Sequence, residues 1–202
     1  RHLLLSFFRT LTGTFSQHLY NAADAMIVGK FVGKEALSAV GGSTGMLTQM
    51  IVGFFVGLSS GASVIISQYY GAKRPEMVGY AVHTAVAFSI LSGVAMMILG
   101  ILLTPFMLSA MGTPEDVMDL SIQYLRIYFL GMVANLIYNT GAAILRAVGD
   151  SRRPLYFLMA SCLFNIVLDL LLVVVLGLGV AGAAIATICS QLLSAVLVAV
   201  CL

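Results

Sequence analysis

Charge is scarce in this sequence. Charged residues make up 9% of its 202 residues, whereas soluble domains carry about 25%. Hydrophobic residues account for 60% of the chain, and tryptophan is absent. So little charge excludes an ordinary soluble domain and indicates a protein built for a lipid bilayer.

The few cysteines and the scattered basic residues exclude further classes of function. The three cysteines lie inside apolar runs, with no Cys-x-x-Cys pair and no histidine at metal-ligand spacing: Cys162, Cys189 and Cys201. We interpret them as small packing residues rather than as a metal site or a disulfide framework. The basic residues are scattered over short loops instead of forming a patch, which argues against nucleic-acid binding. We expect no cofactor.

Long apolar runs are what the sequence has in abundance. Breaks rich in glycine, proline and charge separate six runs, each long enough to cross about 30 Å of hydrocarbon. We predict six transmembrane helices at about 3–30, 37–70, 77–104, 116–145, 155–176 and 180–202. The expected fold class is an all-α membrane protein, a bundle of six transmembrane helices.

The positions of the basic residues predict the orientation. Most of them flank the start of the chain or follow the second and fourth spans: Arg1, Arg9, Lys73, Arg74, Arg146, Arg152 and Arg153. The loops after the third and fifth spans carry no lysine or arginine, and Lys30 and Lys34 are the minority against this pattern. The positive-inside rule therefore predicts a multi-pass protein of the cytoplasmic membrane, with its N-terminus in the cytoplasm.

Two aspartates, Asp24 and Asp169, lie deep inside predicted spans. A carboxylate at the centre of a spanning helix costs about 2.5–3.5 kcal/mol on insertion scales. At a helical rise of 1.5 Å per residue, both aspartates and Thr187 lie about 10 Å below the outer boundary. Asn165 lies one turn from Asp169, and Gln17 two turns from Asp24, each on the same helix face.

Three helices thus contribute polar groups to one depth. This pattern predicts a protein-lined cavity that water can enter, with a protonatable or cation-binding centre. The alternative is a structural clamp, in which Asp169 hydrogen-bonds only Asn165, Thr187 or a backbone amide.

Three stretches resemble the multidrug and toxic compound extrusion (MATE) transporters: LYNAADAMIVGKFVGKEALSAVG (19–41), ILRAVGDSRRPL (144–155) and NIVLDLLLVVVLGLGVAGAAIATICSQ (165–191). The family places two six-helix lobes around a central cavity. The resemblance covers the whole chain and implies that residues 1–202 form the N-terminal lobe, without the C-terminal lobe. Because the chain starts without methionine and ends on an apolar run, we also expect it to be part of a longer protein.

The resemblance implies roles for individual residues. In the branch with DinF-like and archaeal members, the N-terminal lobe holds an aspartate on helix 1, an Asn-x-x-x-Asp on helix 5 and a threonine on helix 6. Asp24, Asn165, Asp169 and Thr187 match these coupling positions one by one. The implied function is export of organic cations or drugs by alternating access, in exchange for H⁺ or Na⁺, with no other metal.

Three more residues match polar cavity positions of that lobe: Gln17, Tyr124 and Asn139. The depth estimate puts Asn139 well below the aspartates. Two positions depart from the family. Arg9 stands where many relatives have a proline, which puts bending of the first helix in doubt. His18 stands where relatives often carry a second glutamine.

Other functions stay open at this stage. A flippase for lipid-linked saccharides belongs to the same superfamily, but such proteins line their cavity with arginines, whereas the cavity candidates here are acidic. An intramembrane aspartyl protease would need a Gly-x-Gly-Asp context, and the nearest sequence, AVGD at 147–150, lies in a basic loop. We therefore expect a transporter rather than an enzyme. Its expected partners are the bilayer, small organic cations, and a C-terminal lobe or a second copy.

Overall fold

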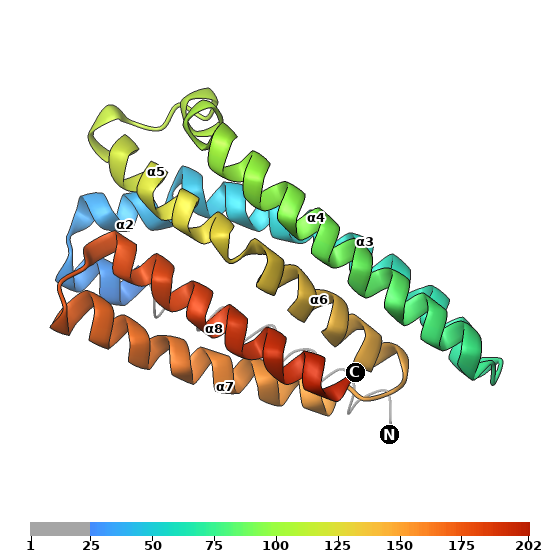
Figure 1. Ribbon diagram of the computed structural model, residues 1–202. Helices are drawn as coiled ribbons and strands as arrows, with labels where there is room; N and C mark the ends of the chain where they lie inside the picture. The colour runs from blue at the N-terminus through green and yellow to red at the C-terminus, as the bar shows by residue number, and fades with distance from the viewer. Residues whose placement is uncertain (1–24) are drawn as a thin grey trace, which may run out of the picture.

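The computed structural model describes residues 25–202, and every regular element in that part of the chain is helical (Figure 1). Residues 25–31 are helical. The elements that follow are α2 Lys34–Gly41, α3 Ser43–Gly71, α4 Pro75–Ala110, α5 Glu115–Leu130, α6 Met132–Ala147, α7 Arg152–Asp169, the π-helical turn η1 Leu170–Val175 and α8 Gly179–Cys201.

Four helical segments are long and apolar enough to cross a membrane: Lys34–Gly71, Pro75–Ala110, Arg152–Val175 and Gly179–Cys201. Helices α5 and α6 form a fifth crossing if they count as one span bent by 52°. The predicted all-helical membrane fold is therefore confirmed. The first predicted span, 3–30, lies mostly outside the described residues.

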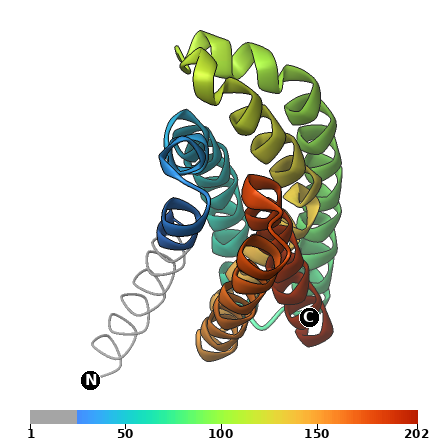
Figure 2. The same ribbon diagram turned by 90° about the vertical axis from the view of Figure 1, so that its left-hand side faces the viewer.

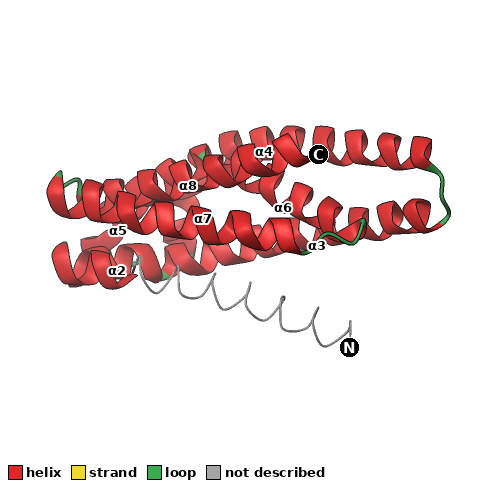
Figure 3. Cartoon of the chain, turned by 90° about the horizontal axis from the view of Figure 1, so that it is seen from below, coloured by secondary structure: helices red, strands yellow, loops and turns green. Residues whose placement is uncertain are grey.

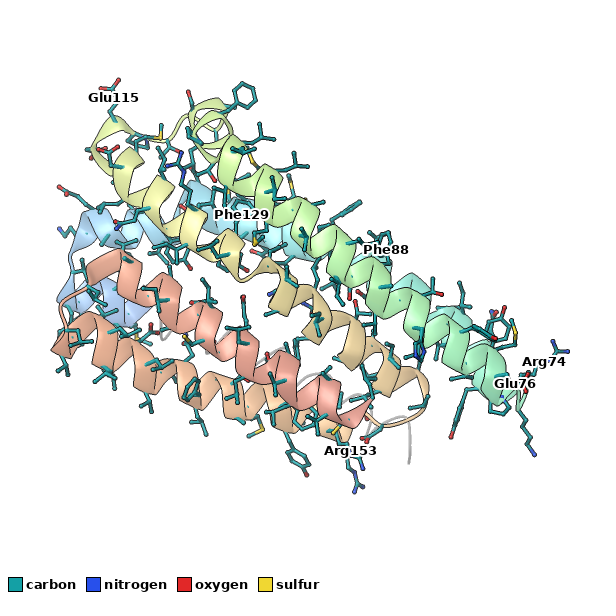
Figure 4. All side chains as sticks on the ribbon, viewed as in Figure 1. Arg74, Glu76, Phe88, Glu115, Phe129 and Arg153 are labelled. Carbon is teal, nitrogen blue, oxygen red and sulfur yellow. The ribbon has the colours of Figure 1, made fainter. Side chains whose placement is uncertain are left out.

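The bent α5–α6 span lies at the centre of the bundle. Helix α6 contacts α3 and α4 on one side and α8 on the other, and α7 packs along α8 (Figures 1 and 2). The buried stripe of the central span recurs at helical spacing: Leu125, Phe129, Met132 and Leu136. This stripe, with Phe129 in the middle of Figure 4, is the core against which the outer helices pack.

Helix α4 contacts the bend of α5–α6 through two of its glycines. A Cβ at Gly93 would lie 2.9 Å from the Cα of Val133, just below the bend, and a Cβ at Gly100 would overlap the ring of Phe129, just above it. Small residues allow such close backbone approach in lipid, where packing rather than water drives helix association. The glycines therefore set how near α4 lies to the central span.

The α3–α4 hairpin extends beyond the ends of α6 and α8 (Figures 1 and 3). Its tip is a tight turn in which Lys73 has a positive φ of 53°. Figure 4 shows Arg74 at this tip and Arg153 at the same end of the bundle, with Glu115 at the other end. The two basic turns, at 73–74 and 152–153, therefore lie at the same end of the bundle.

Candidate functional site

Asn165 and Asp169 lie one turn apart on α7, and neither side chain has any exposed surface. Residues at i and i+4 share a helix face, so the amide and the carboxyl group point into the same interior of the bundle. Asp169 is the only acidic or basic side chain that is buried among residues 25–202. Such a group is expensive inside a membrane and marks a functional position by default.

Thr187 lies on the neighbouring helix α8, 3% exposed. Its hydroxyl donates to the carbonyl oxygen of Ala183 on its own helix, at 2.9 Å. Helix α8 packs along α7 and η1. Asp24 and Gln17 lie outside the described residues, so the predicted meeting of three helices at one depth stays a prediction.

The helix widens directly after Asp169. Residues Leu170–Val175 form a π-helical turn, and the N–H of Leu176 donates to the carbonyl of Leu171, five residues back, at 2.9 Å. Single π-helical turns are rare and occur often at functional sites. Asp169 is therefore the last residue of the α-helix before a π-helical turn.

Tyr124 and Asn139 lie on opposite sides of the bend. Tyr124, in α5, stacks on Tyr128 with ring centroids 6.2 Å apart. Asn139, in α6, donates from Nδ2 to the backbone oxygen of Asn135 and to its Oδ1, both at 2.9 Å. Fifteen residues separate Tyr124 from Asn139, or about 20 Å along a helix. The two candidates therefore do not share one binding shell.

Tyr124 and Asn139 nevertheless belong to one stripe of residues along the central span. Tyr124, Tyr128, Gly131, Asn135 and Asn139 follow one another in steps of four, three, four and four residues, which keeps them on one face. At Gly131 the N–H donates to the carbonyl of Tyr128, three residues back, so the regular hydrogen-bond ladder is interrupted there.

Gln191 meets this stripe at the bend, and the sequence analysis missed it. Its Oε1 is buried and has no hydrogen-bond partner, and a Cβ at Gly131 would lie 2.8 Å from it. The hydroxyls of Thr187, Ser190 and Ser194, on the same helix, all donate to backbone carbonyls of α8. A signal existed, because Gln191 lies four residues after Thr187. The side chain of Tyr128, on the stripe, also lies within hydrogen-bonding reach of Gln191. A buried amide at the bend with an oxygen left unpaired points to a functional role.

No group of three or more histidine, cysteine, aspartate or glutamate side chains that could hold a metal ion occurs in residues 25–202. The buried polar side chains of α7 and α8 carry amide, hydroxyl and carboxyl groups: Ser161, Asn165, Asp169, Thr187, Ser190 and Ser194. Oxygen atoms of this kind suit a proton or a hard cation.

Comparison with known proteins places this architecture in context. The family model described as MatE matches residues 10–171. A probable multidrug resistance protein of Bacillus subtilis (strain 168), YoeA, is 38% identical over 173 residues, which are 83% of this chain and 37% of that protein. The chain spans less than half the length of this relative.

Two solved structures of a multidrug resistance MATE family transporter of the MOP superfamily share the fold. The outward-facing conformation has a TM-score of 0.87 and 30% identity, covering 95% of this chain and 42% of that one. The inward-facing conformation has a TM-score of 0.84 and 31% identity, covering 91% and 41%. The described helices therefore match one part of a longer transporter fold.

Proposed function

This chain belongs to the MatE family, and on that premise we propose that it serves to export organic cations or drugs across the cytoplasmic membrane. The export is driven by H⁺ or Na⁺ moving the opposite way. Asp169 and Asp24 take up the coupling ion, and Asn165 and Thr187 complete its oxygen shell.

The observation that carries this proposal is the complete burial of Asp169 and Asn165 in an apolar helix. A buried carboxylate carries a large desolvation penalty, which a bound proton or Na⁺ removes. Ion binding therefore favours a different packing of the helices that hold the carboxyl group, which is what coupling requires. One elementary charge moving through 100 mV supplies about 2.3 kcal/mol, enough to bias such a change.

Alternating access needs a second lobe. In transporters of this type, two bundles rock against each other around a site near the middle of the bilayer. The relatives matched here are more than twice as long as this chain, and the similar solved structures include an outward-facing and an inward-facing conformation of MATE family transporters. We propose that a C-terminal lobe, or a second copy, completes the cavity.

The flippase alternative is not favoured. A site for a pyrophosphate headgroup would need arginines inside the bundle, and none of the arginines in residues 25–202 is buried. The buried side chain among the acidic and basic residues of this part of the chain is the carboxyl group of Asp169, which suits a cation.

Transport in proteoliposomes tests the proposal. The full-length transporter chain is reconstituted, and movement of a fluorescent organic cation is followed under a pH gradient or a Na⁺ gradient, each imposed alone. We expect one of the two gradients to drive transport and its collapse to stop it. Transport that proceeds equally without either gradient would refute ion coupling.

A further inference from the structure

A cleft of about 390 Å³ opens between α3 and α4, toward the protruding tip of their hairpin. Ile65 and Tyr69 line it from α3, and Met77, Tyr80, Thr84 and Phe88 line it from α4. Phe88 is labelled on α4 in Figure 4, where the helix runs toward Arg74 at the tip. Nothing in the proposed coupling site involves this cleft.

The interior of the cleft suits a hydrocarbon chain. Its one aliphatic hydroxyl, Thr84 Oγ1, already donates to the carbonyl of Tyr80 at 2.8 Å. The other lining groups are aliphatic, aromatic or thioether side chains, two of them tyrosines, and Phe88 and Ile65 are 54% and 51% exposed. Apart from the phenol hydroxyls of Tyr69 and Tyr80, these walls offer a polar ligand no free hydrogen-bonding group, whereas an acyl chain loses nothing by lying against them.

The turn between α3 and α4, at the tip end of the cleft and here called its mouth, carries unpaired positive charge. Lys73 and Arg74 lie in the turn that joins α3 to α4; Lys73 follows the lining residue Tyr69 by four residues, and Arg74 precedes the lining residue Met77 by three. Neither cation forms an ion pair within residues 25–202, although Glu76 lies nearby in the first turn of α4. Tyrosines near the turn are typical of the headgroup level of a bilayer.

The other basic turn among residues 25–202, at 150–153, differs because one of its arginines is paired with a carboxylate. Arg153 Nε pairs with Asp150 Oδ2 at 3.2 Å. Asp150 Oδ1 also accepts the backbone N–H groups of Arg152 and Arg153, at 3.1 and 3.2 Å. The charge of this turn is therefore partly neutralised within the chain, and none of its residues lines the cleft, so it offers a matched control for charge alone.

We propose that the α3–α4 cleft binds an anionic phospholipid, with its phosphate held by Lys73 and Arg74 and one acyl chain lying along the cleft. The predicted orientation places this mouth in the cytoplasmic leaflet, where anionic lipids attract basic residues next to the membrane. An apolar cleft alone would accept any lipid. The two free cations at its mouth make the site selective for a negative headgroup.

Native mass spectrometry of the full-length transporter chain, titrated with dioleoyl phosphatidylglycerol or dioleoyl phosphatidylcholine, measures this selectivity. We expect phosphatidylglycerol to bind about tenfold more tightly. The Lys73→Gln/Arg74→Gln variant should lose the preference, and the Arg152→Gln/Arg153→Gln control should keep it. Both pairs are exposed, so both variants should fold. Ala81→Phe, which fills the cleft, should weaken binding of both lipids.

Three results would overturn the proposal. The first is a preference for phosphatidylglycerol that survives Lys73→Gln/Arg74→Gln. The second is a preference lost equally in the control, which would show a response to surface charge in general. The third is unchanged binding of both lipids by Ala81→Phe, which would place the bound lipid outside the cleft.

Discussion

Replacing Gly93 by alanine should separate α4 from the bend of the central span. The added Cβ would lie 2.9 Å from the Cα of Val133 and 3.3 Å from its Cγ2. The first of these atoms belongs to the backbone of α6, so a simple side-chain rotation cannot relieve the contact. The two helices must move apart, or the bend itself must change.

Two opposing terms decide the sign of the effect. Alanine in place of glycine stabilises a helix by about 0.5–1 kcal/mol, whereas overpacking a tight interface costs about 1–3 kcal/mol. We therefore expect Gly93→Ala to destabilise the fold by about 0.5–2 kcal/mol. Gly79, on the same helix, has no atom within 4 Å of its would-be Cβ. Gly79→Ala should therefore stabilise by about 0.5–1 kcal/mol.

Thermal unfolding of the purified protein in detergent measures both changes. A thiol-reactive dye is a suitable reporter, because the three cysteines of the chain are partly buried and lie in helices. We expect the midpoint to fall by a few degrees for Gly93→Ala and to rise for Gly79→Ala. A midpoint that rises equally in both variants would refute the claim that Gly93 sets the α4–α6 distance.

Three other predictions concern the site and its sidedness. A cysteine at the exposed position Arg152 should react with an impermeant thiol reagent only after the membrane is opened, and one at Glu115 should react from outside; the reverse pattern would invert the predicted orientation. Thr187→Val keeps the shape of the side chain and should lower ion-driven transport at least tenfold; unchanged transport would show that the hydroxyl serves only its bond to Ala183. Asp24→Asn should abolish coupling with normal membrane insertion, and full transport across pH 6–8 would remove Asp24 from the mechanism.

Much of the fold follows from the sequence because long apolar runs have few alternatives in a bilayer. The burial of Asn165 and Asp169 could also be predicted from the sequence. Polar residues spaced by one turn in an apolar helix must turn toward protein, since lipid offers them no hydrogen bond. Local composition therefore suffices for both.

The bend of the central span could not be predicted in this way. The sequence around Gly131 reads as a continuous apolar helix, and the prediction treated 116–145 as one span. The side chains that meet the bend come from far away in the sequence, because Ile188 and Gln191 of α8 would lie 2.9 and 2.8 Å from a Cβ at Gly131. The same holds for the π-helical turn, because the run LLLVVV at Leu170–Val175 carries no polar or glycine marker.

The break between α2 and α3 could be predicted only in part. The chain interrupts its helix at Gly42, next to Gly41, and a glycine pair is a recognisable signal for such a break. The three-helix polar layer remains a prediction, since Asp24 lies outside the described residues.

Ion-driven transport by the Asp169→Asn variant tests the central claim most directly. Asparagine keeps the size and the buried hydrogen-bonding oxygen of the side chain but cannot release a proton or neutralise a cation. Asp119→Asn, at an exposed position on α5, is the matched control. In proteoliposomes of the full-length transporter, we expect Asp169→Asn to bind the organic cation yet to show no transport driven by a gradient, while the control transports normally. Gradient-driven transport by Asp169→Asn at the normal rate across pH 6–8 would contradict the proposed role of this carboxyl group.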